Sequence, residues 1–160
     1  TDLETIAVIR LSCRFPGANN PEEFWNLLRN GKEAVCEVPK DRWDIDEFYD
    51  PTPATPGKMN TRWGGFLDRI AWFDAPFFGI SPREAARLDP QQRLLLEVTW
   101  EALERSGQNP AALAGSDTGV FIGIGSGDYG HLLMAQGLES IEPYMGTGNS
   151  HSVAAGRGEC

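Results

Sequence analysis

The sequence predicts an α/β protein, and three observations lead to that prediction. Two continuous apolar runs, at residues 6–11 and 118–125, have the pattern of strands buried on both faces. An amphipathic helix follows the first run almost at once, which is the order of an α/β layer. A longer helix with a wide apolar arc spans residues 90–106 and indicates a scaffold element buried in the interior.

The first apolar run begins at Ile6 and continues through Leu11, with Arg10 as its one interruption. A guanidinium inside a buried strand must find a partner or reach solvent, because desolvating it costs several kcal/mol. Arg10 is therefore a local conflict with the strand prediction. The turn residues from Cys13 to Gly17 end the run.

The first helix is expected to begin after Asn20. This residue is a good N-cap, Pro21 suits the first helical position, and the next two residues are acidic, beside the positive end of the helix dipole. Gly31 supplies the end of the helix.

From about residue 32 to residue 66 no regular periodicity is present. Prolines and glycines such as Pro39, Pro51, Pro53, Pro56 and Gly57 interrupt the stretch, yet it contains large aromatic side chains, among them Trp43, Phe48, Tyr49 and Trp63. These features predict a long ordered loop held by its aromatics rather than a flexible linker. A functional loop at an interface and a structural insertion are equally compatible with the pattern.

The best-defined part of the chain runs from residue 73 to residue 107. An aromatic cluster lies at its start, formed by Trp72, Phe73, Phe77 and Phe78, and core packing is favoured over a ligand-stacking platform. A short helix through Leu88 follows, with Ser81 as cap and Pro82 at its first position.

The long helix has its own start and stop signals. Asp89 is the expected N-cap and Pro90 the first helical residue, while Gln92, three residues after the cap, would complete a capping box. Gly107 is the expected stop.

Downstream, three glycines at the end of the second apolar run, Gly123, Gly125 and Gly127, resemble the start of a phosphate-binding loop. A phosphate-binding loop would continue with its last glycine and the first residues of a helix. This chain has Asp128 and Tyr129 at those positions. Strand packing is therefore favoured over nucleotide binding. Residues 146–150 are predicted as a glycine-flanked turn, and residues 152–156 as the start of a helix of small residues.

Composition limits the classes of function. A chain of 160 residues is sized for one domain, and its net charge of −9 argues against a nucleic-acid partner, since phosphate neutralisation needs clustered Lys and Arg. No apolar run is long enough to cross a membrane, and no basic flank followed by an apolar stretch opens the chain. We therefore expect a cytoplasmic protein without a membrane partner.

The cysteines and histidines do not form a recognisable site. Cys13, Cys36 and Cys160 are odd in number and lack CxxC spacing, and neither His131 nor His151 is near them in sequence. Free thiols are expected rather than a metal site or disulfides. A Cys–His nucleophile pair that meets only in space stays open.

Taken together, these segments resemble the N-terminal part of a β-ketoacyl synthase (ketosynthase) domain of a type I polyketide synthase. The resemblance rests on Ile6-Ala7-Val8-Ile9, Cys13-Arg14-Phe15-Pro16-Gly17, Val38-Pro39 with Arg42-Trp43, Gly64-Gly65-Phe66-Leu67, Phe73 to Glu104, Thr118 to Gly123, and Ser152 to Arg157. The related condensing domain of fatty-acid synthases is the competing family.

The resemblance implies a thiolase-like α/β/α layered sandwich, of which residues 1–160 would form an incomplete, N-terminal segment. It implies a homodimer in which a cysteine takes an acyl group from the phosphopantetheine of an acyl carrier protein, with no other cofactor. Two histidines would assist decarboxylation of the extender. The nucleophile of such enzymes lies in a Thr-Ala-Cys-Ser-type motif that these residues lack, so we expect the chain alone to be inactive, with no catalytic residue of its own.

What the resemblance assigns to this chain is a lining role. The turn from Gly125 to Tyr129 and the segment from Gly146 to Ser152 correspond to parts of the family that approach the acyl pocket and the dimer contact. The candidate residues are Gly125, Ser126, Asp128, Tyr129, Asn149 and Ser152.

Two features depart from the family pattern: Arg10 stands where a small residue is usual, and Gly158-Glu159-Cys160 replaces an apolar continuation. Two other functions stay in view. One is a non-catalytic module that binds an acyl carrier protein or a ketosynthase, and the other, more remote, is a nucleotide-binding domain.

Overall fold

The computed structural model describes residues 5–137, 139 and 141–157. The chain divides into two compact units. The smaller unit is Cys13–Arg69, and the larger one combines the N-terminal segment up to Ser12 with the residues from Ile70 onward. Residues Gly158-Glu159-Cys160, which differ from the family pattern, lie outside the described residues.

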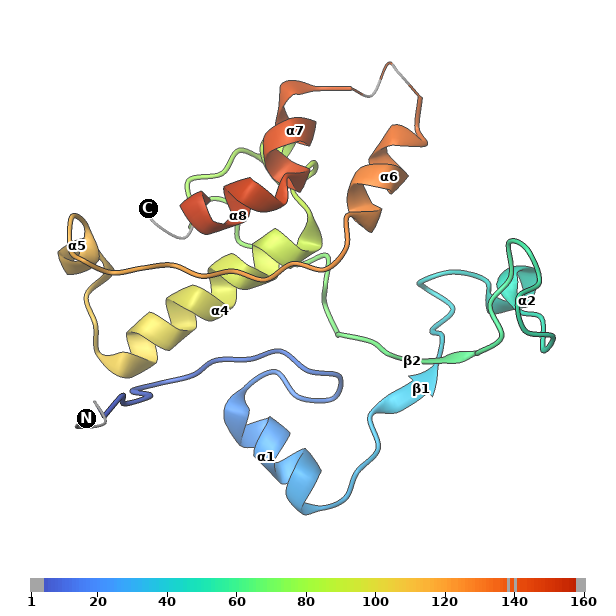
Figure 1. Cartoon of the computed structure of the whole chain (residues 1–160), viewed down its shortest axis with the longest axis horizontal. Coiled ribbons are helices and arrows are strands. Elements are labelled where there is room, and N and C mark those ends of the chain that lie inside the picture. The colour runs from blue at the N-terminus through green and yellow to red at the C-terminus, as the bar shows by residue number, and fades with distance from the viewer. Residues whose placement is uncertain (1–4, 138, 140, 158–160) are drawn as a thin grey trace. The chain divides into compact units, whose positions relative to one another are not determined.

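The smaller unit contains two helices and a two-stranded antiparallel ribbon (Figure 1). In chain order its elements are α1 Pro21–Arg29, β1 Val35–Glu37, α2 Ile45–Phe48 and β2 Trp63–Gly65.

The larger unit is helical apart from its extended segments (Figure 1). Its helices are α3 Pro82–Ala85, α4 Pro90–Ser106, α5 Pro110–Leu113, α6 Asp128–Met134, α7 Pro143–Asn149 and α8 His151–Arg157.

Helix α1 starts as predicted. The side chain of Asn20 accepts a hydrogen bond from the backbone N–H of Glu23 at 2.8 Å, and the Glu23 carboxylate accepts one from the N–H of Asn19 at 2.7 Å. Both groups satisfy backbone donors that have no partner inside the helix. Gly31, in left-handed backbone with φ of 58°, follows the end of the helix.

The stretch predicted as a long loop contains contacts between its aromatic side chains and their neighbours. Trp43 meets Phe66 with ring centroids 5.8 Å apart, and the guanidinium of Arg62 lies 5.0 Å from the ring centre of Tyr49. The ribbon inside this stretch was not predicted. Its strands have three residues each, with Cys36 opposite Gly64, and are too short to show an alternating pattern.

Helix α4 begins and ends at the predicted residues, but the predicted capping box is wrong. Asp89 caps the helix by accepting from the N–H of Gln91 at 2.8 Å, and Gly107 ends it in left-handed backbone with φ of 70°. Gln92 does not reach back to the N–H of Asp89. That N–H donates instead to the carbonyl of Gly148, and the Gln92 side chain donates to the carbonyl of Ser150.

The core of the larger unit lies where α3 turns into α4. Ala75, Ile80 and Leu88 are buried there. Phe73 and Phe78 pack against them, with ring centroids 5.4 Å apart, which confirms the core role predicted for these two rings. Trp72 and Phe77 are largely exposed, although Phe77 meets Trp100 edge-on at 4.9 Å.

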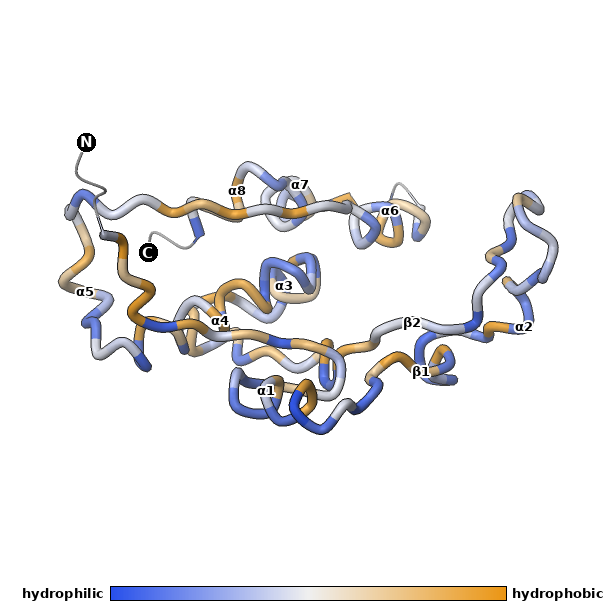
Figure 2. Tube along the Cα trace, turned by 60° about the horizontal axis from the view of Figure 1, so that its bottom comes forward, coloured by the Kyte–Doolittle hydropathy of each residue, from blue (hydrophilic) through white to orange (hydrophobic). Residues whose placement is uncertain are grey.

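The two predicted buried strands are extended but unpaired within the described residues, where the only sheet is the β1–β2 ribbon. The prediction of burial is wrong: Ile6 is 90% exposed and Phe121 94%. Figure 2 shows the apolar character of the N-terminal run by its orange colour. An apolar strand is buried only when neighbouring strands and a packing layer cover it, and among the described residues none do so.

Helix α4 is also less buried than its sequence predicts. It was predicted to be buried, yet only Gln92 is, and the residues from Arg93 to Leu103 are half-buried. The N-terminal segment lies along it: Arg10 donates from Nε to the carbonyl of Arg105 at 2.6 Å, and Ser12 donates to the Glu101 carboxylate at 2.7 Å. Arg10 thus meets its need for a partner while it stays exposed.

Near the C-terminal end, helix α8 matches the predicted helix, whereas the predicted turn at residues 146–150 is wrong. Most of that stretch belongs to α7, which Pro143 starts at its first turn. Asp128, a poor helix start by its sequence pattern, is the first residue of α6. Among the described residues no helix combines the length and apolarity needed to span a membrane.

Candidate functional site at the start of helix α4

The site is built on the corner between α3 and α4. Leu88 is fully buried there, and the two polar residues that follow in the first turn, Asp89 and Gln92, are 3% and 2% exposed. A polar group with so little access to water must find partners within the protein. The partners come from the turn before α6, from α7 and from the start of α8. We call this set of residues the corner cluster.

Helix α7 approaches the corner through its last turn. The backbone N–H of Asp89 donates to the carbonyl of Gly148 at 3.0 Å, and the side chain of Asn149 donates from Nδ2 to the carbonyl of Arg87 at 2.9 Å. A Cβ at position 148 would lie 2.7 Å from the Arg87 carbonyl oxygen. Only glycine lets the two backbones come this close.

The turn before α6 is fixed through one carbonyl. The oxygen of Ser126 lies 3.0 Å from Nε2 of Gln91 and 3.0 Å from Nε2 of His151, which is the donor if the ring carries its proton on that nitrogen. Gln92, one residue further along α4, donates to the carbonyl of Ser150 at 3.2 Å. Adjacent glutamines therefore tie the start of α4 to two different segments.

Tyr129 completes the cluster on α6. Its hydroxyl donates to the carbonyl of Ala86 at 2.7 Å and accepts from Nη2 of Arg93 at 3.3 Å. The Arg93 guanidinium also lies 5.6 Å from the centre of the tyrosine ring. The ring is thus held between α3 and α4, which fixes the orientation of α6.

The structure brings three of the sequence-predicted residues into this cluster: Ser126, Tyr129 and Asn149. The other three, Gly125, Asp128 and Ser152, are exposed, and the hydroxyl of Ser152 lies 2.8 Å from that of Ser150.

Sequence reasoning missed three residues that hold the cluster together: Gln91, Gln92 and His151. The glutamines carry a helix-start signal in the sequence, which hides their tertiary role. The signal that could identify the glutamines is a pair of uncharged polar residues on the first turn of a helix with a wide apolar arc.

Two buried acceptors of the cluster have no donor among the described residues: Oε1 of Gln92 and Oδ1 of Asn149. Each can accept a hydrogen bond from a water or from an amide or hydroxyl of a bound group. The arrangement can position a polar ligand, but the two groups are amides and cannot act as a nucleophile.

An ion-pair network supports the corner from α3. Glu142, the N-cap residue of α7, lies 2.5 Å from Nε of Arg83 and 3.1 Å from Nη2 of Arg87. The hydrogen bond from Arg83, and then the one from Arg87, lower the pKa of Glu142 below its ordinary value. Arg157 on α8 pairs with Glu84 at 2.9 Å.

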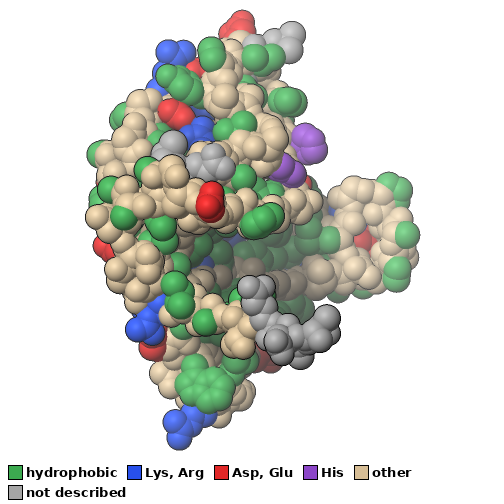
Figure 3. Space-filling model, turned by 60° about the vertical axis from the view of Figure 1, so that its left-hand side comes forward, with side chains coloured by type: hydrophobic (Ala, Val, Ile, Leu, Met, Phe, Trp, Pro, Cys, Tyr) green, Lys and Arg blue, Asp and Glu red, His purple; other side chains and the backbone are tan. Residues whose placement is uncertain are grey.

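The described part of the chain contains no group of three or more His, Cys, Asp or Glu side chains that could hold a metal ion. Cys13 and Cys36 belong to the smaller unit, whereas His131 and His151 belong to α6 and α8 of the larger one. Figure 3 shows the histidine side chains at the molecular surface.

Comparison with known proteins identifies the family. Residues 3–158 match the family described as "Beta-ketoacyl synthase, N-terminal domain". The chain belongs to this family. The match includes both units with all the helices and strands named for them, so the resemblance seen in the sequence is confirmed.

Curated relatives that contain this N-terminal domain are polyketide synthases. The chain is 52% identical to one of the phenolphthiocerol/phthiocerol polyketide synthase subunits of Mycobacterium tuberculosis over 155 residues, which are 96% of this chain and 10% of the relative. It is 54% identical to a mycocerosic acid synthase-like polyketide synthase of Mycolicibacterium smegmatis, over 95% of this chain and 7% of the relative. The chain thus spans about a tenth or less of these proteins.

Solved ketosynthases share the fold. The oxazolomycin ketosynthase domain of Streptomyces albus superposes with a TM-score of 0.82 at 41% identity, over 94% of this chain and 26% of the other. A ketosynthase from module 6 of the bacillaene synthase of Bacillus subtilis gives a TM-score of 0.80 at 38% identity, with 94% and 24% coverage. The predicted fold class, an incomplete thiolase-like α/β sandwich, is confirmed, although the two apolar runs predicted as strands are unpaired within the described residues.

Proposed function

We propose that the chain forms the N-terminal part of a polyketide-synthase ketosynthase. The proposed reaction of the whole domain is β-ketoacyl synthesis, the decarboxylating Claisen condensation of acyl thioesters in polyketide or fatty-acid biosynthesis. The observation that supports this most strongly is the family match over residues 3–158, together with relatives above 50% identity that are polyketide synthases.

In this proposal the chain supplies scaffold and lining, and the reactive groups lie in other parts of the domain. The condensing reaction needs a thiol that forms an acyl-enzyme, which divides one difficult step into two. None of Cys13, Cys36, His131 and His151 lies in a Thr-Ala-Cys-Ser-type motif. We therefore assign no catalytic role to them.

The lining role falls to the predicted residues Gly125, Ser126, Asp128, Tyr129, Asn149 and Ser152, and the corner cluster is their support. Hydrogen bonds from Gln91 and His151 hold the carbonyl of Ser126, so the residues beside it have a fixed backbone to project from. This geometry supports a pocket wall or a dimer contact made by the turn at Gly125 and by Ser152.

The partners proposed are an acyl carrier protein, whose phosphopantetheine delivers the acyl group, and a second ketosynthase subunit in a homodimer. No further cofactor is proposed, and the site of action is the cytoplasm. The carrier protein and the second subunit are proposed from the family match.

A crosslinking experiment tests the lining role. An acyl carrier protein loaded with a photoreactive acyl-pantetheine is mixed with the chain, and the crosslinked peptides are mapped by mass spectrometry. Crosslinks at residues 125–129 or 146–152 are expected. Saturable crosslinking confined to other segments would contradict the assignment.

A second experiment tests whether the chain acts alone. The chain is incubated with an acyl thioester and a malonyl thioester, and acylation of cysteine and release of a ketoacyl product are followed by mass spectrometry. Neither is expected, because the nucleophile is assigned elsewhere in the domain. Saturable carrier-protein binding without turnover would favour the non-catalytic interaction module.

A further inference from the structure

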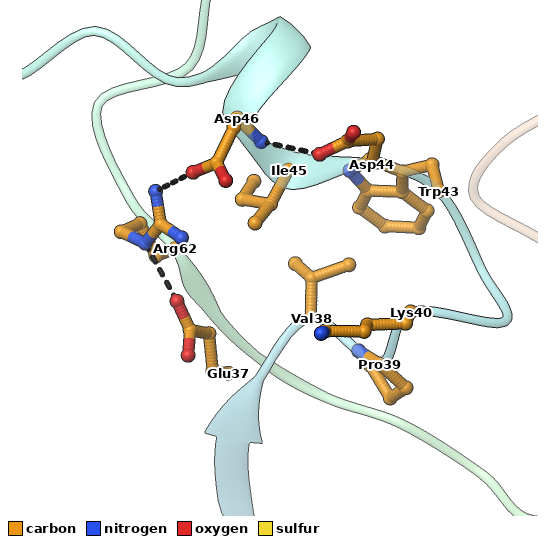
Figure 4. Close-up of a pocket in the computed structure, with 9 residues that line it drawn as sticks. All are labelled: Glu37, Val38, Pro39, Lys40, Trp43, Asp44, Ile45, Asp46 and Arg62. Atoms are coloured by element: carbon orange, nitrogen blue, oxygen red, sulfur yellow. Dashed lines mark hydrogen bonds and ion pairs between the residues drawn. The ribbon is translucent and has the colours of Figure 1, made fainter.

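A pocket in the smaller unit lies outside the corner cluster and has no role in the proposed reaction. It has a volume of about 520 Å³, within the range of small-molecule sites. It lies between the end of β1 and the start of α2 (Figure 4). Nine residues line it: Glu37, Val38, Pro39, Lys40, Trp43, Asp44, Ile45, Asp46 and Arg62.

The apolar part of the pocket is already built. Val38 and Ile45 are buried, and Figure 4 shows their side chains facing each other across the pocket. Trp43 forms the adjoining wall and is 37% exposed, so part of its ring is available to a ligand. The exposed part of the Trp43 ring suits an aliphatic or aromatic body, because contact with it removes apolar area from water.

The carboxylates that line the pocket are already engaged. Arg62 donates from Nε to Glu37 at 2.6 Å and from Nη1 to Asp46 at 2.7 Å, and these hydrogen bonds, that of Asp46 first, raise the pKa of the arginine. Asp44 accepts from the backbone N–H of Asp46 at 3.0 Å as the cap of α2. All three carboxylates therefore have partners, which disfavours a cationic ligand.

Free donors remain on the cationic groups. Nη2 of Arg62 has no hydrogen bond within the described residues, and the Lys40 ammonium has no hydrogen bond or ion pair there either. Figure 4 shows Lys40 extended along the pocket beside Val38 and Pro39. Three carboxylates outnumber two cations, so the long-range field does not attract an anion. Recognition must come from short-range hydrogen bonds to Lys40.

We propose that this pocket binds an amphipathic carboxylate, a small molecule with an apolar body and one anionic end. The body lies against Val38, Ile45 and Trp43, and the carboxylate accepts hydrogen bonds from Lys40 Nζ. The site is independent of the corner cluster and of the proposed condensing reaction.

Lysine footprinting tests the proposal on the unmodified chain. The chain has three lysines, which provide an internal comparison: Lys40 in the pocket, Lys32 exposed after α1, and Lys58, which donates to the carbonyl of Glu47 at 2.6 Å. Brief reductive methylation is carried out with increasing octanoate, and each lysine is quantified by mass spectrometry. Octanol and octyltrimethylammonium provide the same apolar body with a neutral and a cationic end.

Octanoate is expected to slow methylation of Lys40 saturably and to leave Lys32 unchanged. Octanol should protect weakly, and octyltrimethylammonium should not protect. Equal slowing at Lys32 and Lys40, a response to octanoate that does not saturate, no protection, or equal protection by the cationic probe would each overturn the proposal.

A pair of variants locates the site. Trp43→Ala should raise the octanoate concentration for half-protection by about tenfold, because it removes the apolar wall. Trp63→Ala, an exposed tryptophan of the same unit outside the pocket, should leave it unchanged. Equal effects of the two substitutions would show that octanoate binds outside this pocket. If a variant fails to fold, the comparison of the three probes on the unmodified chain still tests the proposal.

Discussion

At the scale of single residues, two glycines of α7 show how differently the same residue type can be used. Gly148 is buried, and a Cβ there would lie 2.7 Å from the Arg87 carbonyl oxygen and 3.2 Å from the Leu88 Cα. Gly146, on the same helix, is exposed, and a Cβ there would meet no atom within 4 Å. Close contact with the backbone of Arg87 and Leu88 therefore requires glycine at position 148, whereas no such contact requires it at position 146.

Gly148→Ala should therefore destabilise the larger unit by about 1–3 kcal/mol, since backbone atoms cannot move aside as a flexible side chain can. Gly146→Ala, the matched control, should be neutral or stabilise by up to about 1 kcal/mol because alanine favours the helix. Urea unfolding midpoints of both variants measure the difference. Equal midpoints would show that α7 does not pack on the corner as described.

Asp89 is another residue whose role follows from its contacts. It is buried, and its carboxylate caps α4 by accepting from the N–H of Gln91. Asp89→Ala should lower the free energy of unfolding by about 1 kcal/mol or more, because a cap acceptor is lost. Asp89→Asn keeps an acceptor and should cost less. If the two substitutions have the same effect in urea unfolding, the cap hydrogen bond is not the cause.

At the scale of elements, α3 and α7 are held together by Glu142 with Arg83 and Arg87. Because the pKa of Glu142 is lowered in the folded state, its contribution to stability is complete above its ordinary value of 4.5 and is lost as the pH falls through the folded value. Glu142→Gln should lower the urea midpoint at neutral pH, and its difference from the unmodified chain should shrink as the solution is acidified below that ordinary value.

The control for this prediction is Glu104→Gln. Glu104 is an exposed residue of α4 in the same unit, and no ion pair involves it within the described residues. Its substitution should change the urea midpoint at neutral pH by much less than Glu142→Gln does. A Glu142→Gln difference that grows on acidification would contradict the expected direction of the pH dependence.

Elements with a complete local signal could be predicted from the sequence. Helices α1 and α4 each have a cap residue and a proline at the start and a glycine after the end, and both form where the sequence predicts. Helix α7 was missed because Gly146 and Gly148 suggested a turn, whereas the proline start at Pro143 and packing on Arg87 favour a helix. The capping role of Gln92 was wrong because a tertiary partner, the carbonyl of Ser150, competes with the local one.

At the scale of the whole molecule, the apolar runs at residues 6–11 and 118–125 are predicted as buried strands, whereas the structure places neither run in a strand and leaves Ile6 and Phe121 exposed. The sequence pattern records the burial that a complete sheet provides, and it contains no information on whether the covering strands are present. The chain corresponds to about a quarter of the solved ketosynthases, so most of the residues that form that fold are not among its own.

The exposed runs predict self-association of the chain. Extended backbone that is unpaired within the described residues, with apolar side chains beside it, pairs readily with further copies. Sedimentation should show association that rises with concentration, and Phe121→Ser should reduce it, whereas Thr147→Ser at an exposed polar position should not. A monodisperse monomer with a cooperative thermal transition would contradict the prediction.

The ribbon pairing of Cys36 with Gly64 has a practical consequence. The thiol of Cys36 is exposed and lies opposite Gly64 in the ribbon, so a maleimide dye can reach it. Glu37 and Val38, the next residues along the chain, already belong to the pocket wall. A dye at Cys36 would therefore turn occupancy of that cavity into an optical signal read within the smaller unit alone.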